Sequence, residues 1–117
     1  MSSPYVKAKA RLEALGYQVG KTEYWNSFAK CRVDLFSCID AVCMRPFTPL
    51  LAIQVTDITS VSKRMEKAHK IAMKWVSTGN RFEVWGFTPK SKKPPRIMEM
   101  LESGEWDTKQ YDPENTA

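Results

Sequence analysis

The chain lacks any long uninterrupted apolar run. Polar or charged residues break every hydrophobic stretch well short of the roughly 20 residues that a membrane-spanning helix needs. The chain also lacks the basic start and apolar middle that are typical of a secretory signal peptide. We therefore expect a protein that has no membrane partner and that is located in the cytoplasm.

Cysteine, histidine and glycine are scarce, with 3, 1 and 5 residues respectively. The three cysteines, Cys31, Cys38 and Cys43, are odd in number and lack the spacing of metal ligands, and His69 is the single histidine. A zinc site is therefore not expected, and the cysteines are predicted to be small, reduced core residues. The sequence contains no internal repeat and no glycine-rich phosphate-binding loop.

The length of 117 residues and the 43% hydrophobic content indicate a single domain with a core. Charge is distributed unevenly along this chain. Residues 1–98 hold 17 Lys and Arg against 7 acidic residues, a net charge of +10, whereas residues 99–117 hold one Lys and six acids. We expect a single domain over residues 1–104 and a flexible acidic tail over residues 105–117. The basic body favours DNA as a partner, and the alternative is charge that serves only solubility.

The stretch Asp34–Thr56 consists of two short apolar runs on either side of a turn with two prolines, a pattern typical of paired strands. Side chains alternate across a strand, so Gln54 and Thr56 share one face of the second run. If the runs pair, Asp40 of the first run converges with them at one end of the hairpin. A carboxylate in an apolar strand is costly unless it is paired or bound to metal, which points to a site.

The spacing of Asp40, Gln54 and Thr56 resembles the core motif of the PD-(D/E)xK nuclease superfamily. There an Asp on one strand is followed, after a turn, by Glu-x-Lys on the next. The similarity is greatest to small resolvase-like and phage-type members, whose element order would cover Val6–Phe87. The segment that begins at Glu23 also looks like uncharacterised phage and bacterial relatives. Gln54 departs from the usual Glu of the motif, and Thr56 departs from the usual Lys.

The resemblance implies Mg²⁺, or Mn²⁺, at a site that contains Asp40. Gln54 would ligate through its carbonyl oxygen without adding charge. Glu23 is a further candidate ligand, or equally a surface carboxylate. Asp34 is another candidate ligand, and it could instead pair with Arg32 or cap a turn; Arg32 could also hold a phosphate. Glu13, on the first predicted helix, matches a family position, but solvation is favoured for it.

The missing lysine at position 56 means that an active nuclease needs a cation from a neighbouring element. The helix predicted to follow starts only a few residues later. Arg64 lies at the edge of its apolar stripe and is the candidate for the active-site role, whereas Lys67 lies nearly opposite the stripe and is the candidate for binding DNA.

Helical periodicity predicts a first helix over residues 4–15 and a long helix over residues 60–78. One face of the long helix is lysine-rich, and a flexible basic loop follows a strand predicted over residues 81–87. These two segments supply the candidate DNA-binding side chains, against the alternative of a simply solvated surface: Lys63, Lys67, Lys70 and Lys74 on the helix, and Lys90, Lys92 and Lys93 in the loop.

The predicted fold class is α/β, a small mixed sheet of about four or five strands flanked by helices, in the manner of a restriction-endonuclease-like core. The function that the resemblance implies is a metal-dependent, structure-selective DNA endonuclease. A catalytically inactive nuclease-fold module that binds nucleic acid, and a phage protein that binds a host protein, are the alternatives. Because resolvase-like relatives act as dimers, a homodimer is also expected.

Overall fold

A computed structural model describes residues 3–22, 24–28, 30–33 and 35–110. Its two α-helices, one 3₁₀ helix and eight strands follow one another as α1 (Pro4–Ala14), β1 (Gln18–Lys21), β2 (Tyr24–Asn26), β3 (Cys31–Val33), β4 (Ala41–Met44), β5 (Leu51–Asp57), η1 (Ile58–Ser60), α2 (Val61–Ser77), β6 (Arg81–Phe87), β7 (Arg96–Met100) and β8 (Trp106–Lys109). Among these residues, no helix is both long and apolar enough to cross a membrane.

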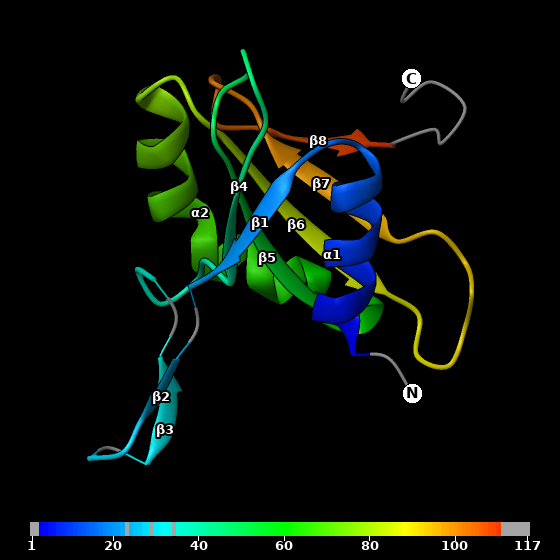
Figure 1. Cartoon of the computed structure of the whole chain (residues 1–117). Helices are drawn as coiled ribbons and strands as arrows, with labels where there is room; N and C mark the ends of the chain where they lie inside the picture. Colours follow the sequence, from blue (N-terminus) through cyan, green and yellow to red (C-terminus); the bar gives the residue numbers. More distant parts are fainter. Residues whose placement is uncertain (1–2, 23, 29, 34, 111–117) are drawn as a thin grey trace.

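Six of the strands form one mixed sheet in the order β1-β4-β5-β6-β7-β8. Strands β5 and β6 are parallel and are joined through α2, and the other neighbouring pairs are antiparallel. A parallel pair requires a crossover connection, which α2 provides. Strands β2 and β3 form a separate hairpin that extends away from the main sheet in Figure 1. The α/β class is confirmed, and the sheet is larger than the four or five strands predicted.

The helices cover opposite faces of the sheet. Helix α1 buries Ala8 and Leu12 against a cluster that includes Ile53 and Trp85. Helix α2 packs a second cluster on the other face, which includes Ala52 and Val84. Neighbouring residues of β5 therefore belong to different cores, as strand alternation requires. The predicted apolar stripe of α2 is confirmed, because its buried residues are Val61, Ala68, Ala72 and Val76.

Helix α1 has the ends that its sequence predicts, whereas α2 begins after Ser60 without a hydrogen bond from a capping side chain. The side chain of Ser3 accepts a hydrogen bond from the amide of Val6 (3.2 Å), and Pro4 occupies the first turn of α1. Gly16 follows the helix with a φ of 92°, a left-handed conformation that glycine adopts without strain. The short helix η1 precedes α2, and Asp57 caps it by accepting from the amide of Thr59 (3.1 Å).

The start of α2 lies directly against β6 because Gly86 has no side chain. A Cβ atom at this position would lie 2.2 Å from Val61 Cγ2 and 3.1 Å from Ile58 Cα. Gly86 pairs with Thr56 of β5, so the same close approach brings the first turn of α2 over the end of β5. A side chain at position 86 would therefore push the start of α2 away from the sheet.

Two segments differ from the sequence-based expectation. Only Ala41–Met44 of the first apolar run forms a main-sheet strand; the preceding residues turn, with φ of 52° at Phe36 and 65° at Ser37. The boundary predicted for the tail, residue 105, is too early, because Trp106–Lys109 form β8 at the edge of the sheet. Trp106 is half-buried and lies edge-on to Phe82, with ring centroids 6.2 Å apart, which anchors β8.

Candidate active site at the end of the central hairpin

Asp40 lies immediately before β4, at the end of the β4–β5 hairpin. Its amide donates to the carbonyl of Ile53 (2.9 Å), and its carboxylate Oδ2 accepts from the amide of Val55 (2.7 Å). Ala41 pairs with Ile53, so Asp40 comes opposite Gln54. The half-buried carboxylate thus extends the strand pairing, with one oxygen engaged by the backbone.

Gln54 lies on the face of β5 that α2 covers, because it alternates with Ile53 of the α1 face. Its side chain is fully buried, and neither its amide oxygen nor its amide nitrogen has a hydrogen-bond partner in the described structure. Thr56, two residues further on the same face, is 7% exposed. The two variant motif positions are therefore covered by the protein instead of opening into a cleft.

The carboxylate of Asp40 and the amide oxygen of Gln54 are the groups that would have to hold the Mg²⁺ that the resemblance implies. A carboxylate and an amide carbonyl are suitable hard ligands, but Mg²⁺ usually keeps several waters and takes phosphate oxygens of its substrate. The burial of Gln54 leaves no access for either. Within the described residues, no group of three or more His, Cys, Asp or Glu side chains could hold a metal ion. The observed arrangement does not fit a hydrated Mg²⁺, so we derive no catalytic step from it.

The remaining proposed ligands lie where the structure gives no side-chain information. Glu23 and Asp34 are outside the described residues, and Arg32 is described only as part of β3.

Asp57 ends β5, and its pKa is lowered chiefly because the hydroxyl of Thr59 donates a hydrogen bond to its carboxylate. This acid therefore acts as a cap for η1.

The two cations proposed from α2 occupy different environments. Arg64 is half-buried, in keeping with its predicted place at the edge of the apolar stripe, whereas Lys67 is exposed. Lys63, Lys70 and Lys74 are exposed as well, and none of the four lysines forms an ion pair with an acid in the described part of the chain. The helix thus presents a row of cationic side chains without counterions from the described fold.

A charged network that the sequence analysis did not single out lies on the α1 face of the sheet. Glu83 is fully buried in β6 and accepts from the guanidinium of Arg81 (2.7 Å) and from the indole of Trp85 (2.9 Å). Arg81 also donates to Glu99 (2.8 Å) and to the hydroxyl of Tyr17 (3.2 Å). Its sequence signal was a carboxylate inside an apolar strand, the signal used for Asp40. These contacts give Glu83 a structural role.

Burial also decides the chemistry of Cys43 on the same face. The side chain is fully buried, and this burial, followed by the nearby negative charge of Glu83, raises the pKa of the thiol to about 12. Cys38 is buried too, and neither of these two cysteines forms a disulfide bond in the described structure. For these two residues, the prediction of reduced core cysteines is confirmed. A thiol with such a raised pKa is a poor nucleophile at neutral pH, so Cys43 is not a catalytic candidate.

Comparisons with known proteins add no assignment. No protein-family model, no curated protein and no solved structure matched this chain.

Proposed function

We propose that this protein binds DNA through the lysine row of α2, as a nuclease-like module without an accessible metal centre. The observation that carries the proposal is the set of four exposed lysines that lack acidic partners among the described residues. Lys63 and Lys74 are separated by eleven residues of helix, which corresponds to about 16 Å along its axis. A cationic row of this length can follow the phosphates of a DNA strand.

The order of elements supports a relationship to the resembled nucleases. In those proteins a helix and a strand are followed by a hairpin, a second helix and another strand. Here α1, β1, β4, β5, α2 and β6 follow in that order, with the β2–β3 hairpin inserted. The motif positions are altered, since Gln54 and Thr56 are buried and neither can carry charge. A binding module that keeps the architecture without an open metal site accounts for both features.

The experiment is a salt titration of duplex DNA binding, followed by fluorescence anisotropy. Four phosphate contacts predict a slope of about −3.6 for log K against log salt concentration, and each lost contact makes the slope shallower by about 0.9. We expect Lys67→Gln and Lys70→Gln to weaken binding on all sequences and to make the slope shallower. Lys9→Gln, which removes the same charge from α1, is the matched control. A slope near zero, or equal effects of all three changes, would overturn the proposal.

A metal-dependent endonuclease is the second candidate, and the position of Asp40 opposite Gln54 at the end of the hairpin is the observation that favours it. This candidate requires that Gln54, which is fully buried in the structure, becomes accessible to a metal ion. Gln54→Glu tests this idea. Without metal, the new buried carboxylate should destabilise the fold; if the position can ligate metal, millimolar Mg²⁺ or Mn²⁺ should restore stability by mass action.

Two controls separate metal binding from a general salt effect. Ca²⁺ and additional NaCl should not restore Gln54→Glu to the same degree, and Asp40→Asn in the same background should remove the Mg²⁺ effect. In parallel, cleavage of branched and single-stranded DNA is measured for wild type and for Asp40→Asn. If Mg²⁺ leaves Gln54→Glu unchanged and wild type cleaves neither substrate, the endonuclease candidate fails and DNA binding alone remains.

A further inference from the structure

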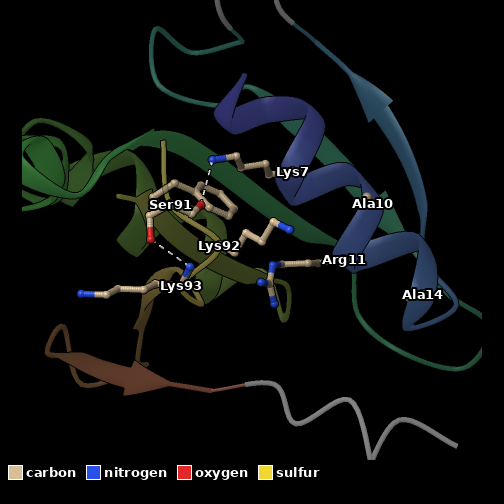
Figure 2. A pocket seen from close by; sticks show the side chains of 8 residues that line it. Lys7, Ala10, Arg11, Ala14, Ser91, Lys92 and Lys93 are labelled. Atoms are coloured by element: carbon tan, nitrogen blue, oxygen red, sulfur yellow. Dashed lines mark hydrogen bonds between the residues drawn. The ribbon is translucent and has the colours of Figure 1, made fainter. Parts of the chain in front are cut away.

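A second cationic region lies on the α1 side of the sheet, away from the lysine row of α2. Here α1 and the loop between β6 and β7 border an open pocket of about 420 Å³. Its lining residues are Lys7, Ala10, Arg11, Ala14, Phe87, Ser91, Lys92 and Lys93 (Figure 2). Four of these eight residues are cationic and none is acidic.

The pocket is partly pre-organised by contacts between its two walls. Lys7 Nζ donates to the backbone carbonyl of Ser91 (3.4 Å) and lies 5.8 Å from the centroid of the Phe87 ring. Ser91 Oγ accepts from the amide of Lys93 (3.1 Å), which shapes the loop. Figure 2 shows the side chains of Arg11 and Lys92 extending toward one another from opposite walls. An anion placed between these two groups would relieve their mutual repulsion.

The interior of the pocket is apolar, in contrast to its charged rim. Ala10 and Ala14 contribute exposed methyl groups, and Phe87, the last residue of β6, also lines the pocket although it is only 3% exposed. A simple inorganic anion would leave the apolar surface uncovered, and a neutral apolar molecule would leave the charges of Arg11 and Lys92 without a counterion. The combination matches a ligand that has a flat apolar part and a phosphate.

The position of the pocket in the fold agrees with this chemistry. Phe87 pairs with Asp57, so the pocket lies at the carboxyl ends of the parallel strands β5 and β6, where open α/β sheets commonly bind ligands. Helix α2 begins at this same end of the strands, with Lys63 in its first turn. The pocket and the start of the lysine row therefore lie at the same end of these strands, on opposite faces of the sheet.

We propose that the pocket binds an unpaired nucleotide of a DNA strand, with the base on the apolar surface and the phosphate between Arg11 and Lys92. As a DNA site it rests on the proposed DNA binding, but its nucleotide chemistry can be tested alone. Thymidine monophosphate and inorganic phosphate are titrated separately by calorimetry. We expect the nucleotide to bind about tenfold more tightly, a difference typical of one base contact.

Three variants and one control variant assign the binding to this pocket. Arg11→Gln and Lys92→Gln should each weaken thymidine monophosphate binding about fivefold or more, whereas Lys9→Gln, on the same helix but outside the pocket, should leave it unchanged. Ala10→Leu fills the pocket without altering charge, and should abolish the advantage of the nucleotide over phosphate. Circular dichroism and urea unfolding verify that each variant is folded. Equal binding of nucleotide and phosphate by wild type, or unchanged nucleotide binding by Ala10→Leu, would overturn the inference.

The same variants are then compared on a blunt duplex and on a duplex with a five-nucleotide single-stranded end. We expect wild type to prefer the single-stranded end, and Ala10→Leu to lose this preference while keeping its affinity for the blunt duplex. If blunt-duplex binding is normal but no preference exists, the pocket inference fails and the proposed function stands. If thymidine monophosphate binds the pocket but no duplex binds, the proposed function fails and the nucleotide pocket stands.

Discussion

Replacing Gln54 with methionine should stabilise the protein. Methionine has nearly the same shape and flexibility, so the packing under α2 is retained while both polar atoms are removed. These two atoms are buried without hydrogen-bond partners in the described structure. Burying an amide in this way costs about 1–3 kcal/mol in proteins. We therefore expect Gln54→Met to raise the free energy of unfolding by about 1–3 kcal/mol.

Urea denaturation, followed by tryptophan fluorescence and by circular dichroism, measures this change directly. For a domain of this size, each 1 kcal/mol corresponds to about 4 °C in the melting temperature. Gln18→Met is the matched control, because Gln18 is exposed on β1 and its replacement should change stability by less than about 0.5 kcal/mol. If Gln54→Met instead lowers the free energy of unfolding by about 1 kcal/mol or more, the amide has a partner such as a buried water. The reasoning about an unpartnered group would then be refuted.

Three further predictions concern the surroundings of the site. Gly86→Ala should lower the free energy of unfolding by about 1–3 kcal/mol, because the new Cβ would lie 2.2 Å from Val61 Cγ2; unchanged urea stability would contradict this close packing. Cys43, whose pKa is raised to about 12, should resist iodoacetamide at pH 8 until the protein unfolds, and peptide mass spectrometry can show this. Because folding raises the pKa of this thiol, its contribution to stability is complete below the unfolded pKa and is lost as pH rises toward 12. Asp57→Asn should be less stable than wild type at neutral pH, and this difference in stability should disappear as pH falls through the lowered pKa of Asp57. Urea unfolding at several pH values measures the difference. A difference that persists in acid would exclude a charge-dependent cap.

Local patterns in the sequence were sufficient for the helices and for the central hairpin. The 3.6-residue spacing of apolar side chains predicted α2 and its buried stripe, and Gly16 marked the end of α1. These features depend on residues a few positions apart, so the chain order contains them. Alternation and the turn with two prolines also predicted that the two runs pair and bring Asp40 near Gln54, and the structure has Asp40 opposite Gln54.

Other features depend on which distant segments pack together, and they could not be read from local patterns. The sequence indicated that Gln54 shares a face with Thr56, but its burial depends on α2 packing over that face of the sheet. Likewise, the carboxylate of Glu83 resembled that of Asp40 in the sequence, and only the position of Arg81 and Tyr17 around it distinguished a paired structural acid from a candidate ligand.

The sequence by itself determined the α/β class, the two helices, the paired central strands and the cationic character of the body. The tertiary structure alone decided the solvent access of the motif positions, the addition of β8 to the sheet, and the pocket formed where α1 meets the loop after β6. The physical reason is that periodicity and turn chemistry act over neighbouring residues. Burial and the convergence of charges arise from contacts between segments up to about eighty residues apart, such as Lys7 with Ser91.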